Sequence, residues 1–182
     1  IVSSLLPIDT NHVTERFSDK TVNEIVKAAS EMSRAKTGAL IVIEQNVRLD
    51  EYERTGIVID SVLTSQILIN IFEHNTPLHD GAVIVRGNRI TAATCYLPLS
   101  DNMLLSKELG TRHRAGVGIS EVTDSLTVIV SEETGAISVA YKGELMRKLT
   151  AEELKKLLVM AQNKTAAQKK FRLWKGWNRN EI

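Results

Sequence analysis

The sequence has little cysteine, little proline and no long apolar runs, and each shortage excludes a class of protein. Its single cysteine, Cys95, rules out an intrachain disulfide framework and a cysteine-rich zinc module, and it suits a reducing cytosol. No apolar run exceeds five residues, at 39–43 and 157–161, so these 182 residues contain no membrane span by sequence. With three scattered prolines and no repeat, the length suits one domain with a sizeable core.

An excess of charge of one sign is also missing, because 23 basic and 22 acidic residues leave a net charge of +1. This excludes a strongly basic protein that coats nucleic acid. Residues 142–182 nevertheless hold eleven basic and four acidic residues, a balance of +7, so the first 141 residues carry −6. We expect an N-terminal segment over 1–20, a folded domain over 21–163 and a basic C-terminal tail over 164–182.

The common nucleotide and hydrolase motifs are absent from the sequence. It has no P-loop, no H-E-x-x-H and no G-x-S-x-G. The dinucleotide-binding pattern fails as well, because Glu121 follows Gly116 and Gly118 where a third glycine is needed.

Apolar spacing predicts alternating helices and strands. An i, i+3, i+4, i+7 pattern or an apolar stretch predicts helices, with capping boxes expected at Thr21 with Glu24 and at Thr150 with Glu153. Short apolar runs between turn residues predict strands. The predicted helices are 21–32, 64–73 and 150–162, and the predicted strands are 39–44, 56–60, 82–85, 89–96, 126–130 and 137–141. Segment 48–55 is predicted to be a loop.

Two hairpins are predicted within this series, one turning at Gly87-Asn88 and one over 132–135. Strand 39–44 is apolar throughout, which is typical of a strand buried on both faces. Together these patterns predict a single α/β domain with a mixed central β-sheet flanked by helices on both faces.

Three polar turns beside apolar strands carry the candidate chemistry. In the first, Asp80 stands where a carboxylate is a natural metal ligand or base at a sheet edge, and Gly81 lets a ligand approach the backbone. Taken alone, Asp80-Gly81 is better explained as an ordinary turn, and His79 beside it as an exposed histidine.

The second turn places Arg112, His113 and Arg114 directly after Gly110 and Thr111. Guanidinium groups bind phosphate oxygens in pairs, and the threonine and glycine add a hydroxyl and free backbone N–H groups. A helix that starts here would add a dipole favourable to an anion. The turn therefore indicates phosphate binding.

A solvated basic turn is the alternative for this segment, with its arginines paired to Glu108 and Glu121. Against it, the run falls in the acidic part of the chain and is followed by the small residues Ala115 and Gly116, which suggest backbone kept open for a ligand.

The third turn follows another apolar strand and contains Ser131, Glu132 and Glu133. A hydroxyl and carboxylates at a strand end suit a phosphate and a divalent cation, although in isolation a polar hairpin turn is the better explanation. The convergence of the three turns in one small domain is more informative, because together they suit a triphosphate, a metal and an acceptor hydroxyl.

These residues resemble a known family. Asp80-Gly81-Ala82 and the Arg112-His113-Arg114 run are similar to the two signature motifs of the diadenylate cyclase (DAC) domain, which condenses two ATP into cyclic di-AMP and two pyrophosphates. The longer stretches NTPLHDGAVIV, YLPLS, LSKELGTRHRAGVGISEVTDS and IVSEETGAIS strengthen the similarity, which runs from about 21 to 158. Among cyclase types the chain resembles the catalytic domain of the membrane-anchored bacterial enzyme.

The resemblance implies a role for each matching residue. It assigns catalysis to Asp80, Arg112, His113 and Arg114, and a divalent metal (Mn²⁺, Mg²⁺ or Co²⁺) to Asp80 and His79. It assigns ATP binding to Gly81, Ala82, Tyr96, Leu97, Gly110, Thr111, Arg112, Ser131, Glu132 and Glu133, with Tyr96 and Leu97 against the adenine.

The resemblance also implies partners and a location. Each domain holds one ATP, so ring closure needs a homodimer with two ATP around a twofold axis, and nucleic acid has no part in it. It further implies an anchor preceding residues 1–20, a place at the cytoplasmic face of the cell membrane for the full-length protein, solubility for this portion and a regulatory protein as a further partner.

Two other functions stay open. A non-catalytic ATP-binding regulatory module would keep Gly81, Thr111 and Arg112 but would not need Asp80. A membrane- or nucleic-acid-interaction protein acting through the basic tail would bind in a strongly salt-dependent way, with the three turns irrelevant.

Overall fold

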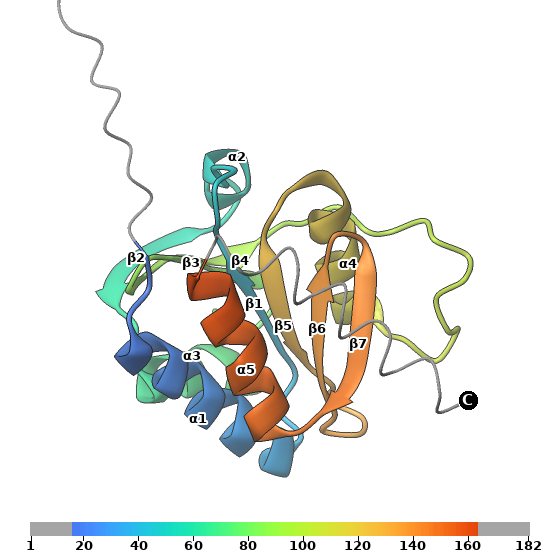
Figure 1. Ribbon diagram of the computed structural model, residues 1–182, viewed down its shortest axis with the longest axis horizontal. Coiled ribbons are helices and arrows are strands. Elements are labelled where there is room, and N and C mark those ends of the chain that lie inside the picture. The colour runs from blue at the N-terminus through green and yellow to red at the C-terminus, as the bar shows by residue number, and fades with distance from the viewer. Residues whose placement is uncertain (1–15, 164–182) are drawn as a thin grey trace, which may run out of the picture.

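The computed structural model describes residues 16–163, which form a seven-stranded sheet with helices on both faces (Figure 1). The strands are β1 (Ala39–Ile43), β2 (Ile57–Val62), β3 (Ala82–Arg86), β4 (Arg89–Cys95), β5 (Leu126–Val130), β6 (Ile137–Tyr141) and β7 (Glu144–Leu149). The helices are α1 (Asp19–Ala35), α2 (Asp50–Glu53), α3 (Ser65–Phe72), α4 (Thr111–Val122) and α5 (Ala151–Gln162). The predicted tail, and the N-terminal segment except for residues 16–20, lie outside this range. Within it, no helix is both long and apolar enough to cross a membrane.

The sheet is mixed, as the sequence predicts. Its strand order is β2-β4-β3-β1-β5-β6-β7, with β1 and β3 parallel and every other neighbouring pair antiparallel. Both predicted hairpins are confirmed, β3–β4 turning at Gly87-Asn88 and β5–β6 turning through 131–136.

The sheet separates two apolar clusters. Helices α1, α3 and α5 pack on one face, where they lie together in Figure 1, and α4 packs on the other. Strand β1 serves both faces, because Ile41 and Ile43 belong to the first cluster and Leu40 and Val42 to the second. The prediction of a strand buried on both faces is therefore confirmed.

Three segments differ from the expected secondary structure. Segment 48–55 contains the single-turn helix α2 instead of only a loop. Helix α4 and strand β7 were not among the predicted elements. Helix α4 carries two glycines that lower helix propensity, and β7 is an edge strand with exposed charges that hide the alternation of a strand.

The helix caps agree with the sequence at α5 and differ from it at α1. At α5, the predicted capping box of Thr150 and Glu153 is present. At α1, the predicted box of Thr21 and Glu24 is wrong, because Ser18 caps the helix and accepts from the Thr21 N–H. The Glu24 carboxylate instead accepts from the backbone N–H of Ser65 in α3, and this hydrogen bond lowers the pKa of Glu24.

Candidate active site

The three polar turns meet at one cavity of about 430 Å³ on the α4 side of the sheet. The turn before β3, the end of β4, the start of α4 and the turn after β5 all contribute to its wall. The lining residues are Leu40, Asp80, Gly81, Cys95, Tyr96, Leu97, Leu99, Glu108, Gly110, Thr111, Arg112, His113, Ala115, Val130, Ser131, Glu132 and Glu133. Of the predicted site residues, His79, Ala82 and Arg114 do not line it.

His79 and Asp80 place two atoms that can ligate a metal next to each other. Nε2 of His79 lies 3.5 Å from Oδ1 of Asp80, whose side chain is 88% exposed. Nδ1 of His79 lies 2.7 Å from the Thr76 carbonyl oxygen, which can only accept, so Nδ1 carries the proton. In the neutral ring, Nε2 then presents its lone pair beside the Asp80 carboxylate.

This pair fits a divalent cation held partly by substrate. Among the described residues, no group of three or more His, Cys, Asp or Glu side chains is placed to hold a metal. Mg²⁺ and Mn²⁺ are commonly held by one or two protein groups, with phosphate oxygens and water completing the shell. His79 Nε2 and Asp80 Oδ1 could supply the protein's share of such a shell, and a backbone carbonyl on the far nitrogen is the usual support for a ligating histidine.

Gly81 is required by the local backbone of the protein, independently of any ligand. Its φ is +92°, and a Cβ there would lie 2.8 Å from the carbonyl carbon of Thr94. Thr94, itself at φ +55°, sits in a stretch of β4 where the pairing with β3 is irregular. The close approach predicted for a ligand is thus made by the backbone of β4, although Gly81 also lines the cavity.

The second turn is the beginning of a helix. Gly110 is the N-cap of α4 and makes no side-chain capping bond, and the first intrahelical bond is donated by Arg114 to the Gly110 carbonyl. The N–H groups of the first helical residues therefore lack helical acceptors at the cavity wall. Together with the helix dipole, they make this end of α4 favourable for an anion, as predicted for a helix starting here.

Arg112 is the cation of this helix end. Its Nη1 donates to Oε2 of Glu132 at 2.7 Å, and its Nε is buried without a hydrogen-bond partner. The alternative of a solvated basic turn named Glu108 and Glu121 as the partners of the arginines, but Glu121 accepts from the Ser100 hydroxyl instead. An orphaned N–H on a cation that lines a cavity suits an anionic ligand.

Glycines 116 and 118 do not keep the backbone open for a ligand. A Cβ on Gly116 would meet the Ile129 side chain at 2.7 Å, and one on Gly118 would meet the Pro98 carbonyl oxygen at 1.9 Å. They instead allow α4 to pack closely on β5 and on the 97–100 segment. Gly110, by contrast, has free space where a Cβ would be.

His113 differs from its neighbours in the basic run. It is 8% exposed, and burial lowers the pKa of its ring, with Arg147 and Arg112 lowering it further. His113 is therefore neutral near pH 7 and does not add to the positive charge of the cavity.

The end of β4 supplies an apolar part of the wall. Tyr96 is 81% exposed at the mouth and Leu97 is 6% exposed inside, an arrangement that suits one flat ring between an aromatic and an aliphatic group. The Tyr96 N–H donates to the Thr55 hydroxyl at 2.8 Å, which ties this wall to the segment after α2. Cys95 also lines the cavity, but burial raises the pKa of its thiol to about 12, so it is no nucleophile.

The third turn is an ordinary polar turn that also lines the cavity, so the two interpretations of its sequence are compatible. The Ser131 hydroxyl oxygen accepts from the N–H groups of Glu133 and Thr134 at 3.3 and 3.2 Å, as in an ordinary polar turn. Its hydroxyl hydrogen stays available to a ligand. Glu132 and Glu133 line the cavity beside it.

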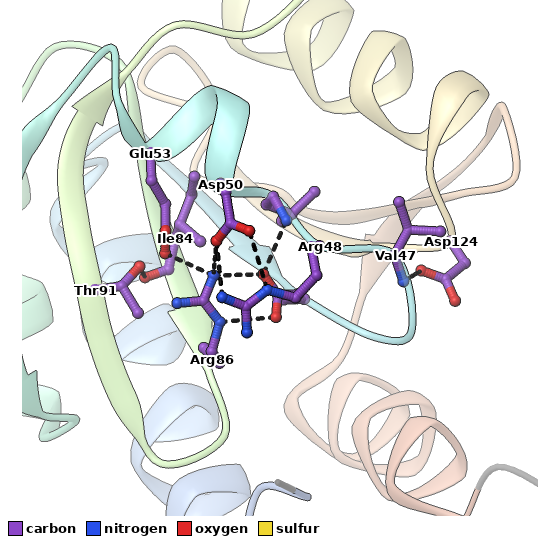
Figure 2. A network of polar contacts seen from close by, with 10 residues as sticks. Val47, Arg48, Asp50, Glu53, Ile84, Arg86, Thr91 and Asp124 are labelled. Carbon is purple, nitrogen blue, oxygen red and sulfur yellow. Dashed lines mark hydrogen bonds and ion pairs between the residues drawn. The ribbon is translucent and has the colours of Figure 1, made fainter. Parts of the chain in front are cut away.

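An ion cluster that the sequence did not reveal supports the wall from outside (Figure 2). Arg86 on β3 makes a two-pronged contact with the Glu44 carboxylate at 2.8 Å on each oxygen, and it also reaches Asp50 and Glu53 of α2 at 3.1 and 2.9 Å. The Glu44 side chain is 1% exposed, so Arg86 neutralises a buried charge. Helix α2 is thereby fixed to the sheet just before Thr55.

Residues 26–145 match the DAC family, described as DisA bacterial checkpoint controller nucleotide-binding, and the chain belongs to this family. It is 57% identical over 144 residues to the cyclic di-AMP synthase CdaA of Bacillus subtilis and 51% identical over 164 residues to the diadenylate cyclase of Listeria monocytogenes. These alignments cover 79% and 89% of the chain but only 53% and 60% of the relatives, so the chain spans little more than half their length.

The same fold is present in a solved structure. A double mutant of DacA from Staphylococcus aureus superposes with a TM-score of 0.78 at 50% identity, covering 79% of this chain and 96% of that one. The mixed α/β domain predicted from the sequence is therefore shown both by the structure and by this relative.

Proposed function

We propose that this domain is a diadenylate cyclase that condenses two ATP into cyclic di-AMP and two pyrophosphates. The observation that carries the proposal is the exposed Asp80 carboxylate at the edge of a cavity whose wall holds Arg112 and the N-terminus of α4. The names of the relatives support it, since both similar chains are cyclases or synthases of cyclic di-AMP.

In this proposal the ring closes by two identical displacements at phosphorus, and the residues of each domain contribute to one of them. The 3′-oxygen of one ATP attacks the α-phosphorus of the other, the bond from the α-phosphorus to pyrophosphate breaks, and the hydroxyl proton passes to the Asp80 carboxylate. Arg112 and the N–H groups at Gly110 and Thr111 stabilise charge on the phosphates, with the Ser131 hydroxyl beside them. Tyr96 and Leu97 hold the adenine.

A divalent cation between His79 and Asp80 would supply Lewis-acid stabilisation of the phosphates and lower the pKa of the attacking hydroxyl. Glu132 and Glu133 line the same cavity, and their carboxylates would favour a cation bound together with the triphosphate. We include Mg²⁺, Mn²⁺ and Co²⁺ in the proposal, because all three accept carboxylate ligands, and the His79 imidazole would favour Co²⁺ and Mn²⁺ over the oxygen-preferring Mg²⁺.

The proposed reaction needs two copies of the domain. Each cavity holds one ATP, so both new bonds form only if two cavities face each other around a twofold axis. The 88% exposed Asp80 side chain supports this, because it is free to meet the substrate of a facing copy. A membrane anchor in the full-length protein, a place at the cytoplasmic face of the membrane and a regulatory partner remain predictions.

The direct test is to incubate the domain with ATP and Mn²⁺ and to identify cyclic di-AMP by chromatography with mass detection. We expect product with metal and none with a chelator or with Asp80→Asn. An absence of product over several metals and protein concentrations would contradict the proposal and favour an ATP-binding regulatory module.

A further inference from the structure

Gly38 lies directly against the guanidinium of Arg112. The glycine is buried between α1 and β1, 74 residues before Arg112 in the chain. A Cβ at this position would stand 2.5 Å from Nη1, 2.7 Å from Cζ and 3.2 Å from Nε. These three atoms span the guanidinium, so the charged group rests on the Cα of Gly38.

The backbone does not require glycine here. The glycines with positive φ in the described part of the chain are Gly81, Gly87, Gly135 and Gly143, and Gly38 is not among them. An L-residue can therefore adopt this conformation, and the atoms nearest to its Cβ all belong to Arg112. The space that glycine provides is space for the guanidinium.

The guanidinium is thus confined on two sides. Gly38 limits it on one face, and Glu132 holds Nη1 at 2.7 Å from the edge. Nε remains buried without a partner. The Gly38 face and the burial of Nε persist when a phosphate replaces Glu132 at Nη1, so this part of the confinement lowers the entropy cost of ordering Arg112 on binding.

We propose that Gly38 is a positioning residue, which sets the place from which Arg112 binds the phosphates of ATP. The inference rests on the proposed function for the role of Arg112, and it adds a residue from the α1–β1 connection that makes no phosphate contact itself. A methyl group on Gly38 would force the guanidinium to move by roughly 1 Å to restore ordinary separations. Because Arg112 is long and flexible, the chain folds normally and the displaced arginine is the consequence.

A double-mutant cycle tests this mechanism through ligand affinity. Binding of ATP and of adenosine is measured by calorimetry in a chelator, which prevents turnover, for the parent, Gly38→Ala, Arg112→Ala and the double variant. We expect Arg112→Ala to weaken ATP binding roughly 10- to 100-fold and Gly38→Ala roughly 5- to 10-fold, with adenosine unchanged. In the Arg112→Ala background, Gly38→Ala should change ATP affinity by less than about twofold.

Thermal unfolding of the same four proteins gives an independent readout. Alanine restricts the unfolded chain, so Gly38→Ala should raise Tm by roughly 1–4 °C once Arg112 is removed, and by less or not at all when Arg112 is present. This comparison does not depend on ATP.

The outcomes separate the two claims. If Arg112→Ala leaves the ratio of ATP to adenosine affinity unchanged, the phosphate role in the proposed function is wrong, and the positioning role is wrong with it. If Arg112→Ala weakens ATP binding but Gly38→Ala does not, or weakens it equally in both backgrounds, only the inference about Gly38 is overturned.

Discussion

Nη1 of Arg112 donates to Oε2 of Glu132 across 2.7 Å, and this ion pair connects the first turn of α4 with the turn after β5. Glu132 is 58% exposed and Arg112 is 21% exposed, so the pair stands at the boundary between cavity and solvent. In the proposed function, the triphosphate must replace this carboxylate as the partner of Arg112.

Substitution Glu132→Gln should therefore tighten ATP binding when no divalent ion is present. The glutamine keeps the shape but removes a negative charge next to the phosphates, and an exposed ion pair is worth about 0.2–1 kcal/mol. Measured by calorimetry in a chelator, ATP affinity should rise by up to about fivefold, and adenosine affinity should not change. Weaker ATP binding would mean that Glu132 supports the ligand instead of competing with it.

Substitution Arg86→Met should destabilise the fold, although Arg86 itself does not line the cavity. It leaves the Glu44 carboxylate, 1% exposed, without its cation, and breaking a buried pair costs about 3–5 kcal/mol. Urea unfolding should show this loss in the free energy of unfolding, and Glu44→Gln in the same chain should recover part of it. A loss below about 1 kcal/mol would mean that the backbone N–H of Leu49 and the nearby Arg48 compensate Glu44 without Arg86.

The lowered pKa of His113 predicts how stability depends on pH. The ordinary pKa of a histidine is 6.5, so below about pH 6.5 His113 binds a proton in the unfolded chain but stays neutral in the folded protein. The contribution of His113 is complete above pH 6.5 and is lost as the pH falls toward the lower pKa of the folded state. His113→Gln should therefore have a smaller fall in Tm between pH 7 and pH 5 than the parent, and equal slopes would refute this origin.

Local sequence patterns were sufficient to predict much of the fold. Leu157 and Leu158 share one face of α5 behind the Thr150 cap, and the continuous apolar run of β1 predicts a strand buried on both faces. Helix α4 was harder, because Gly116 and Gly118 serve close packing against Ile129 and Pro98, which only the tertiary structure reveals.

For the site too, local sequence patterns predicted some features, and others depend on tertiary contacts. The sequence predicted that Asp80, Arg112 and Ser131 belong to one site, and the structure places all three at one cavity. It did not predict that Glu132 is the partner of Arg112 or that Gly38 lies beneath it, because those contacts join residues 20 and 74 positions apart. Pairings over such distances depend on the sheet order, and no local pattern encodes them.

Substitution Asp80→Asn should separate binding from chemistry. The amide keeps the size of the carboxylate but can neither accept the hydroxyl proton nor contribute charge to a metal, so product should disappear. ATP affinity in a chelator should stay within about twofold of the parent, since the 88% exposed side chain contributes little to the cavity wall. Cyclisation at near the parent rate would contradict the role assigned to Asp80.

The most direct test of the central claim is to mix this Asp80→Asn variant with the parent domain at several ratios and, after subunit exchange, to measure cyclic di-AMP per parent subunit. If ring closure needs two competent copies, an equal mixture should give about half the product per parent subunit, because half of the parent copies then face a variant, and a linear intermediate should accumulate. Product per parent subunit that stays constant at every ratio, with exchange demonstrated, would mean that each subunit completes the reaction alone and would contradict the two-domain mechanism.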